Sequence, residues 1–220
     1  MIQIVTTTDG SHTIYVPELK EHYHSMHGAF QESEFIFMKN GYDTCNADPV
    51  NILEIGFGTG LNVLLTAHRS LAEKKKVFYT TLEKYPLDKE ITGKLNHHIY
   101  TGIRGKELSD KIHGSEWGKM IDILPFFWLL KIRCDLTKDD IGGLYDLVYF
   151  DAYGPDKQPE MWSENVLKKI SDVTKSNGIF ITYSCKGEVK RKLREYGFKV
   201  TLIQGPPGKR HIIRAIKILK

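Results

Sequence analysis

Four acidic residues are the part of this sequence best suited to chemistry. Glu54, Glu83, Asp135 and Asp151 each stand at or near the end of an apolar run. Such runs are typical of strands in a buried parallel sheet, where ligands bind beyond the carboxyl ends of the strands. Because an unpaired buried charge is costly, four acids at strand tips indicate one ligand crevice.

Three glycines at alternate positions, Gly56, Gly58 and Gly60, follow the apolar run that begins at Val50. A helical apolar pattern begins at Leu61, so this segment predicts a strand, a tight turn and a helix start. The glycines leave room for a ligand beside the main chain. Their Gly-x-Gly-x-Gly spacing differs from the Gly-x-Gly-x-x-Gly of nicotinamide sites, and the loop has no Walker lysine.

The second acid has the spacing of a ribose ligand. Glu83 lies 23 residues after Gly60, at the end of the next β-rich run. An acid near this distance accepts hydrogen bonds from ribose hydroxyls in nucleotide-binding folds. The pattern therefore predicts a cofactor that contains a nucleoside.

Strands and helices alternate along the chain, which predicts a doubly wound α/β sheet. The expected strands are residues 50–55, 77–82, 126–133, 145–150, 179–183, 198–202 and 212–219, and the expected helices are residues 61–71, 87–100, 159–173 and 188–196. Residues 101–120 are rich in glycine and give no clear element. Residues 1–47 read as an N-terminal extension with a hairpin over 1–16 and a helix over 17–31, and residues 48–220 as the main domain.

Composition narrows the class of protein. The chain has 220 residues, 41% hydrophobic and 26% charged, with a formal net charge of +4. These values are ordinary for a globular protein, no apolar run is long enough to span a bilayer, and the N-terminus does not resemble a signal peptide. Three widely spaced cysteines argue against a disulfide framework or structural zinc. We therefore expect a cytoplasmic protein, with a charge compatible with a nucleic-acid partner.

Three histidines, His22, His24 and His27, fall within the expected N-terminal helix. Helical spacing would bring two of them together, so a metal site must be considered. They form no recognisable metal motif with the nearby acids, and solvated or capping histidines are the simpler interpretation. We predict no metal.

The Glu-x-Gly-x-Gly-x-Gly strand tip resembles the S-adenosyl-L-methionine site of class I methyltransferases. That resemblance implies a Rossmann-like, seven-stranded, mostly parallel sheet with an antiparallel C-terminal strand. It also implies that the glycine loop passes under the methionine part, that Glu83 binds the ribose and that Asp135 contacts the adenine amine. The implied cofactor-binding residues are Glu54, Gly56, Phe57, Gly58, Thr59, Gly60, Asn62, Glu83, Lys84, Asp135, Leu136 and Asp151.

A narrower resemblance concerns the substrate. The string Phe-Asp-Ala-Tyr-Gly-Pro-Asp-Lys-Gln-Pro-Glu-Met-Trp over 150–162, with Glu-Lys-Tyr-Pro-Leu over 83–87, Thr-Tyr-Ser-Cys-Lys-Gly over 182–187 and Gly-Pro-Pro-Gly-Lys-Arg over 205–210, resembles the methyltransferase half of the MnmC family. The resemblance runs from about residue 21 to the C-terminus. It implies methylation of 5-aminomethyl-2-thiouridine to 5-methylaminomethyl-2-thiouridine at wobble position 34 of tRNA. The fused family members carry an FAD-dependent oxidase domain, and we expect the stand-alone form, MnmD, supplied with its aminomethyl substrate by a separate enzyme.

The implied acceptor is a primary amine, which must lose a proton before it can attack a methyl group. Asp151 is placed to orient the amine and accept that proton, and Tyr153 is placed to bound or stack on the base. Lysines and arginines in loops around the crevice would contact tRNA phosphates. The implied catalytic residues are Asp151 and Tyr153, and the substrate-binding residues are Tyr153, Pro155, Lys157, Trp162, Lys186, Lys209 and Arg210.

Two alternatives stay open. An aminopropyltransferase that acts on a polyamine also has acids at strand tips and a primary amine as acceptor. A non-catalytic RNA-binding module could keep the same fold, although the intact glycine loop and acids argue against it.

Overall fold

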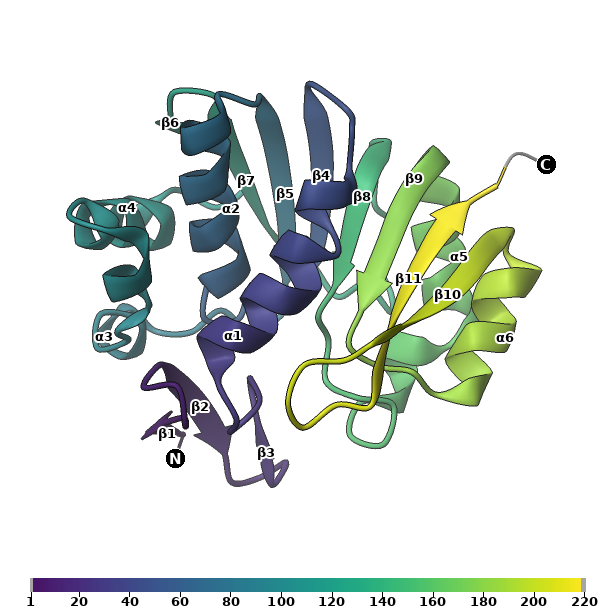
Figure 1. Cartoon of the computed structure of the whole chain (residues 1–220), viewed down its shortest axis with the longest axis horizontal. Helices are drawn as coiled ribbons and strands as arrows, with labels where there is room; N and C mark the ends of the chain where they lie inside the picture. Colours follow the sequence, from purple (N-terminus) through teal and green to yellow (C-terminus); the bar gives the residue numbers. More distant parts are fainter. Residues whose placement is uncertain (1, 219–220) are drawn as a thin grey trace.

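A computed structural model describes residues 2–218 and contains a central eight-stranded sheet (Figure 1). The strand order is β10-β11-β9-β8-β4-β5-β7-β6. Strands β4, β5, β7, β8 and β9 run parallel, whereas β6, β10 and β11 are joined by antiparallel pairings. The strands are β4 (Val50–Ile55), β5 (Val77–Glu83), β6 (Met120–Leu124), β7 (Phe127–Arg133), β8 (Tyr145–Phe150), β9 (Thr174–Thr182), β10 (Phe198–Gln204) and β11 (His211–Lys217). The predicted class I methyltransferase architecture is confirmed.

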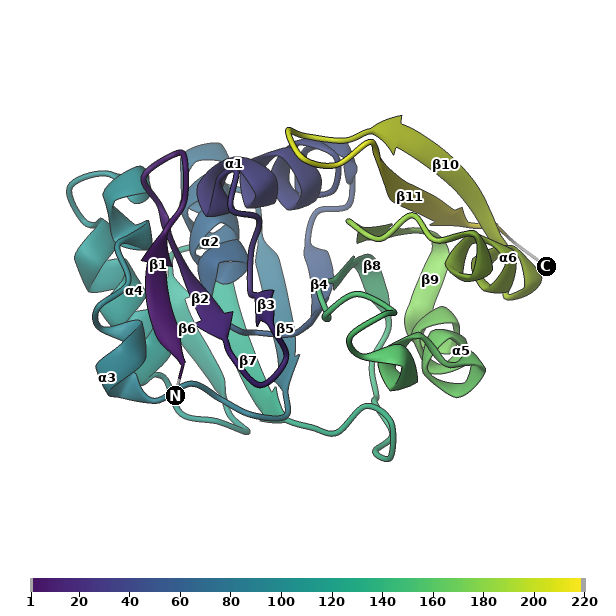
Figure 2. The same ribbon diagram turned by 90° about the horizontal axis from the view of Figure 1, so that it is seen from below.

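Helices cover both faces of this sheet (Figure 2). One face is covered by α1 (Ala29–Ser33), the π-helical η1 (Glu34–Lys39), α2 (Leu61–Glu73) and α4 (Gly105–Gly114), and the other by α5 (Glu164–Val173) and α6 (Gly187–Glu195). The central strands are buried on both sides, which explains why their sequences are nearly continuous apolar runs. The remaining short helices are η2 (Tyr42–Thr44), α3 (Lys89–Thr92), η3 (His97–Thr101) and η4 (Pro159–Trp162).

A second, three-stranded sheet precedes the main one. It contains β1 (Gln3–Thr6), β2 (His12–Val16) and β3 (Glu21–His22). The predicted N-terminal hairpin is confirmed by the antiparallel pairing of β1 with β2. The division at residue 47 stays a prediction.

The helix predicted over residues 17–31 is wrong. Residues 21–22 pair with β2 as strand β3, and the helix begins only at Ala29. Its start is fixed from outside, because the Ser11 hydroxyl accepts hydrogen bonds from the backbone N–H groups of Ala29 (3.0 Å) and Phe30 (3.1 Å). The Asp9 carboxylate accepts a third from Gln31 at 2.9 Å. Caps that come from a distant hairpin leave no local signal in the sequence.

Three further differences lie between residues 87 and 124. The helix expected over 87–100 is two short helices, α3 and η3, and the unassigned segment after it contains α4. Strand β6 was not predicted, so the sheet has eight strands rather than seven. It is an edge strand with few buried side chains, and it joins β7 through a tight turn in which Phe126 has a φ of +73°. Its apolar pattern is therefore weak.

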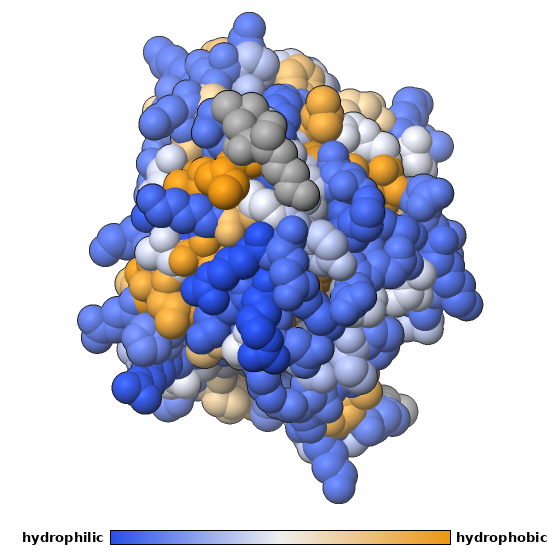
Figure 3. Space-filling view, turned by 90° about the vertical axis from the view of Figure 1, so that its right-hand side faces the viewer, coloured by the Kyte–Doolittle hydropathy of each residue, from blue (hydrophilic) through white to orange (hydrophobic). Residues whose placement is uncertain are grey.

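The surface at the α6–β10 end of the molecule is mainly hydrophilic, with its apolar area divided into separate patches (Figure 3). The last predicted strand ends as β11 at Lys217, and the final position expected for it, residue 219, lies outside the described residues. Among residues 2–218, no helix is both long and apolar enough to cross a bilayer.

Replacement of Ser11 by alanine is expected to destabilise the fold by about 1–2 kcal/mol, because the Phe30 N–H loses its acceptor and the Ala29 N–H keeps only the Thr7 hydroxyl at 3.4 Å. Urea unfolding measures this loss. The matched control is Thr8→Ala in the same hairpin, whose exposed hydroxyl donates to Met26 O, and its effect should stay within about 0.5 kcal/mol. Equal effects of the two substitutions would contradict the capping role of Ser11.

Candidate active site

The glycine loop between β4 and α2 can be built only with glycine at its key positions. Gly56, Gly58 and Gly60 all have positive φ values, of +92°, +49° and +73°. A Cβ atom at Gly56 would lie 2.8 Å from the Asp151 carbonyl oxygen, and one at Gly60 would lie 2.9 Å from the His113 ring. The loop therefore lies directly against the tip of β8, as the spacing of the glycines predicts.

A pocket opens beyond the carboxyl ends of β4, β5, β7 and β8, with about 1040 Å³ of unfilled space including its mouth. The sequence-predicted residues that line it are Gly56, Phe57, Gly58, Thr59, Asn62, Glu83, Lys84, Asp135, Leu136, Asp151 and Tyr153. Three of the four predicted acids therefore meet at one crevice. Gly60 is not among the lining residues and acts in the turn itself.

Glu54 does not line the pocket with the other three acids, so the expectation that it points into the crevice is wrong. Its side chain is fully buried, and its Oε2 accepts a hydrogen bond from the Thr81 hydroxyl at 2.6 Å. The residue lies within β4 rather than at its tip, because the strand continues through Ile55. Burial raises the pKa of the Glu54 carboxyl to about 8, and the bond from Thr81 opposes that rise.

Glu83 joins the end of β5 to the glycine loop. Its Oε2 accepts a hydrogen bond from the Gly58 backbone N–H at 3.0 Å, and its Oε1 accepts one from the Tyr85 N–H at 2.9 Å. Each carboxylate oxygen has a second lone pair. The side chain is therefore oriented by the backbone and can still accept hydrogen bonds from a ligand in the pocket.

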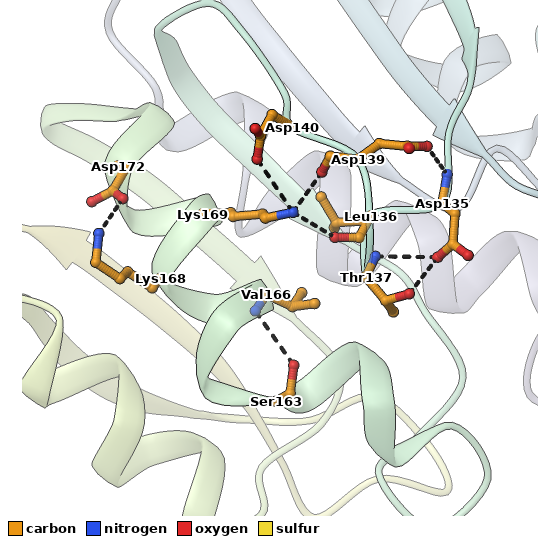
Figure 4. Close-up of polar contacts among 10 residues, drawn as sticks. All are labelled: Asp135, Leu136, Thr137, Asp139, Asp140, Ser163, Val166, Lys168, Lys169 and Asp172. Atoms are coloured by element: carbon orange, nitrogen blue, oxygen red, sulfur yellow. Dashed lines mark hydrogen bonds and ion pairs between the residues drawn. The ribbon is translucent and has the colours of Figure 1, made fainter.

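Asp135, after β7, is held in a network of its own (Figure 4). Its Oδ1 accepts hydrogen bonds from the Thr137 hydroxyl (2.6 Å) and N–H (3.2 Å), and its Oδ2 lies 2.9 Å from the Lys84 ammonium. The Thr137 and Lys84 bonds lower the pKa of the carboxyl to about 2. The same loop is tied to α5 by Lys169, whose ammonium donates to the carbonyls of Leu136 and Asp139.

Asp151 lies directly after β8, where its N–H donates to Ile55 O at 3.0 Å. Its Oδ2 accepts a hydrogen bond from the Asn62 side-chain amide at 2.9 Å. Burial raises the pKa of the Asp151 carboxyl to about 7, and the Glu32 carboxylate adds to the rise. The Asn62 amide and the Lys209 ammonium oppose it. The group is thus a carboxyl poised to change its charge near neutral pH.

Asn62 supplies a second open polar atom. It lies in the first turn of α2, and its Oδ1 is buried without a hydrogen-bond partner among the described residues. A buried carbonyl oxygen without a donor is costly unless a ligand or water satisfies it. Asn62 therefore orients the Asp151 carboxylate through its amide N–H, and that carboxylate is the acceptor offered to a hydrogen-bond donor in the pocket.

Tyrosines surround this pair. The rings of Tyr153 and Tyr23 meet edge to face with their centroids 5.5 Å apart, and the Tyr183 hydroxyl donates to Ala152 O at 2.9 Å. Tyr23 and His24 come from the N-terminal extension, and His24 Nε2 lies 2.8 Å from the Thr59 hydroxyl. Burial lowers the pKa of His24 to about 4, so its ring is neutral.

Sequence reasoning missed about half of the lining residues. Some adjoin predicted motifs and could have been included from neighbouring positions, whereas Tyr23 and His24 carry no sequence signal for the pocket beyond their residue types. The missed residues are Tyr23, His24, Ile55, Leu61, Leu82, Tyr85, Cys134, Thr137, Ala152, Gln158, Glu160, Met161 and Tyr183. No group of three or more histidine, cysteine, aspartate or glutamate side chains is arranged to hold a metal within residues 2–218.

Six predicted substrate-binding residues do not line the pocket: Pro155, Lys157, Trp162, Lys186, Lys209 and Arg210. Trp162 is buried, packs on Phe150 and donates its indole N–H to Tyr153 O at 2.8 Å, so it supports the pocket from the core.

The three lysines of this set have partners within the chain. Lys157 donates to Leu19 O at 3.0 Å, Lys186 pairs with Asp156, and Lys209 lies 2.9 Å from a Glu32 oxygen. The Arg210 side chain is exposed.

Residues 127–218 match a family described as S-adenosyl-L-methionine-dependent methyltransferase. The chain is 28% identical over 209 residues to the "tRNA 5-methylaminomethyl-2-thiouridine biosynthesis bifunctional protein MnmC" of Campylobacter hominis, which covers 92% of this chain and 31% of that protein. It is also 28% identical over 224 residues to the MnmC protein of Cupriavidus metallidurans, covering 94% of this chain and 32% of that protein. The chain thus spans about a third of the length of these relatives.

Two solved structures share the fold. One is MNMC2 from Aquifex aeolicus, with a TM-score of 0.76 and 23% identity, covering 99% of this chain and 70% of that one. The other is a methyltransferase from Pyrococcus furiosus, with a TM-score of 0.51 and 19% identity, covering 85% and 82% of the two chains. These two structures support the fold, and the family match identifies S-adenosyl-L-methionine as the cofactor.

The pocket has the features that this cofactor requires. The glycine cradle would be filled by any side chain at Gly56 or Gly58, since a Cβ at Gly58 would lie 3.1 Å from the Tyr23 ring. Glu83 presents carboxylate oxygens at the tip of the second parallel strand, where a ribose is bound in related folds. The glycine loop and Glu83 therefore fit this cofactor.

Asp151→Asn is expected to change how stability depends on pH. The folded pKa of about 7 lies above the ordinary aspartate pKa of 3.8, so the folded state binds more protons and loses stability as pH rises through this window. The variant lacks the pH-dependent contribution of this carboxyl to the free energy of unfolding, which is on the order of 2–4 kcal/mol. Its stability relative to wild type should therefore increase between pH 4 and 7, as measured by urea unfolding without cofactor.

The matched control for that experiment is Asp156→Asn, which makes the same change in the exposed loop that follows. A difference between Asp151→Asn and wild type that stays constant from pH 4 to 8 would show that burial does not perturb Asp151.

Proposed function

We propose that this chain, an S-adenosyl-L-methionine-dependent methyltransferase similar to part of MnmC, methylates the primary amine of 5-aminomethyl-2-thiouridine at wobble position 34 of tRNA. The observation that carries the proposal is the Asp151 carboxyl beside the glycine loop, in a pocket bounded by tyrosines. The similarity to MnmC relatives over more than nine-tenths of the chain supports the choice of substrate.

The cofactor supplies an electrophilic methyl group when it is bound. The glycine loop would hold its methionine part, Glu83 would accept hydrogen bonds from its ribose, and Asp135 would stand near its adenine. Asp135 reaches that role with its carboxylate already paired to Lys84 and Thr137. The backbone of Asp135 and the neighbouring Leu136 therefore matter for the shape of the adenine end of the pocket, in addition to the charge of the Asp135 carboxylate.

Asp151 would handle the proton of the acceptor. A primary alkylammonium with a pKa near 10.4 has no lone pair at neutral pH. A carboxylate whose own pKa is raised to about 7 is a better proton acceptor than an ordinary aspartate. Asp151 would take the proton of the ammonium, and the lone pair freed on the nitrogen would then be available to attack the electrophilic methyl group that the cofactor would supply.

The tyrosines would receive the base. Tyr153 follows Asp151 by two residues, and its ring packs edge to face on that of Tyr23, which also lines the pocket. A base turned out of the anticodon can stack on such a ring. We place Tyr153 as the main contact, with Tyr23 of the N-terminal extension supporting its ring.

The predicted phosphate contacts differ in availability. Lys186 and Lys209 are paired with Asp156 and Glu32, and Lys157 holds the backbone of the N-terminal extension, so each would exchange an internal partner for a phosphate. Arg210 is exposed and makes the strongest candidate of the set. A tRNA substrate also implies a cytoplasmic location and an enzyme that supplies the aminomethyl group, and both belong to the proposal.

Asp151→Ala is expected to lower the rate of methyl transfer by about 10²–10⁴-fold, because the acceptor amine loses its orienting partner and its proton acceptor. Cofactor affinity, measured by calorimetry, should change by only a few fold. The assay follows transfer of a labelled methyl group to tRNA from cells that lack the final methylation. Asp172→Ala, at an exposed position of α5 that the site does not use, is the control and should retain activity.

Three outcomes would defeat this proposal. They are full activity in Asp151→Ala, equal methylation of an unmodified tRNA transcript, and transfer from the decarboxylated cofactor to putrescine without RNA. The last outcome would identify an aminopropyltransferase instead. Failure of the wild-type chain to bind S-adenosyl-L-methionine would favour a non-catalytic RNA-binding module.

Substitutions at Tyr153 should distinguish the contribution of its ring to activity from that of its hydroxyl. The hydroxyl is buried and has no hydrogen-bond partner among residues 2–218, so Tyr153→Phe is expected to keep near wild-type activity. Tyr153→Ala removes the stacking surface and should raise KM for tRNA by roughly 10–100-fold. Steady-state kinetics at saturating cofactor measure both values. A large loss in the phenylalanine variant would instead assign a role to the hydroxyl.

A further inference from the structure

A second pocket adjoins the candidate active site and shares Phe57 with it. It lies among the segment before α3, the end of α4 and the last residues of β7, and it encloses about 590 Å³ of unfilled space including its mouth. In Figure 1, α3 and α4 lie next to each other beside α2. Nothing in the proposed methyl transfer uses this pocket.

The pocket is rich in positive charge. Lys89, Lys131 and Arg133 line it, and Asp88 is the one acid among its lining residues. His113 also lines it, but burial and the Lys131 ammonium lower the pKa of that ring to about 4, so it adds no charge near neutral pH. Three cations against one carboxylate in a concave site create a field that favours an anion.

Lys131 is the unusual member of this group. Only 1% of its surface is exposed, and its ammonium donates to Ile112 O at 2.9 Å and His113 O at 3.0 Å. It also lies 5.0 Å from the Trp117 ring centroid and 5.4 Å from that of Phe57. Within residues 2–218, no carboxylate forms an ion pair with it.

A buried ammonium without a counter-ion is costly, because carbonyls and rings replace only part of its hydration. Burial accordingly lowers the pKa of Lys131 to about 8, and the nearby Lys89 ammonium lowers it further. An anion bound in this pocket would supply the missing counter-charge. The side chains of Lys89 and Arg133 are exposed and can close on such an anion from the rim.

The position of the pocket indicates which anion it meets. Residues 83–85 line the first pocket and residues 86–89 line the second, so one continuous segment forms a wall of each. A nucleic acid whose base enters the first pocket carries a phosphate on either side of that base. Such a phosphate is the anion that a polynucleotide would present to the second pocket, which shares Phe57 and this segment with the first.

We propose that the pocket formed by Lys89, Lys131 and Arg133 is a phosphate site, and that it binds a backbone phosphate of the tRNA whose base enters the active site. The choice of RNA as the source rests on the proposed function. The assignment to a phosphate group rests on the cations that line the pocket. Free phosphate or a small phosphate ester carries the same group, so the experiment must distinguish these sources.

The test compares two variants with the same loss of charge. Lys89→Gln/Arg133→Gln changes the rim of the pocket and leaves Lys131 in place. Arg191→Gln/Lys199→Gln changes exposed residues of α6 and β10 at the opposite end of the sheet (Figure 1). Fluorescence anisotropy gives the Kd of labelled tRNA at several salt concentrations, and thermal unfolding and calorimetry verify that each variant folds and binds S-adenosyl-L-methionine as wild type does.

The pocket variant should bind tRNA roughly tenfold more weakly at 0.1 M salt, and the slope of log K against log salt should fall by about 1. The control variant should change affinity by less than about threefold. Asp88→Asn should tighten tRNA binding, because it removes the acid of the pocket. Each result would support the phosphate site.

Unchanged tRNA affinity in the pocket variant would overturn the proposal, and so would an equal loss in the control variant. Saturable binding of inorganic phosphate that the pocket variant loses, together with unchanged tRNA affinity, would overturn the assignment to RNA. The readout is binding, so it is separate from the methyl-transfer assay. A chain that binds tRNA through this pocket but methylates none would contradict the proposed function and leave this inference intact.

Discussion

The close approach of the glycine loop to the tip of β8 is the constraint on which the site depends. Gly56 has no room for a Cβ, because the Asp151 carbonyl oxygen already lies where that atom would contact it. The adjacent hydrogen bond from the Asp151 N–H to Ile55 O fixes the two strand tips in register. The loop that would hold the methyl donor and the acid that would meet the acceptor are thus positioned by one contact. A shift of either strand would separate them.

The N-terminal extension completes this arrangement. It contributes Tyr23 and His24 to the pocket, and several of its side chains bond to the main domain. His24 bonds to Thr59 in the glycine loop, Lys157 bonds to Leu19 O, and Glu32 pairs with Lys209 in the loop between β10 and β11. The pocket is therefore closed by a segment that a minimal methyltransferase sheet does not contain, and the Glu32 carboxylate influences the Asp151 pKa from that segment.

The parts of the fold that could be predicted are those in which local sequence and tertiary role agree. The apolar runs of β4 and β8 read as central strands because both faces are buried, and three glycines read as a ligand loop because their backbone excludes other residues. The prediction of a helix over 17–31 was wrong because the helix that forms begins at Ala29, where Ser11 and Asp9 cap it from a distant part of the sequence. The prediction for Glu54 was wrong because the strand ends one residue later, at Ile55. A difference of one residue at the strand tip decides whether an acid faces the pocket or is buried.

Glu54 also explains how the site can hold a charged Asp151. The two carboxyls influence each other, since the Asp151 carboxylate raises the pKa of Glu54 in addition to burial. Two ionised carboxyls in one poorly solvated region would repel strongly. When an ammonium enters the pocket it favours the ionised form of Asp151, and that charge in turn favours the protonated form of Glu54. The protonated Glu54 then needs no counter-ion, and the negative charge is confined to the acid that faces the acceptor.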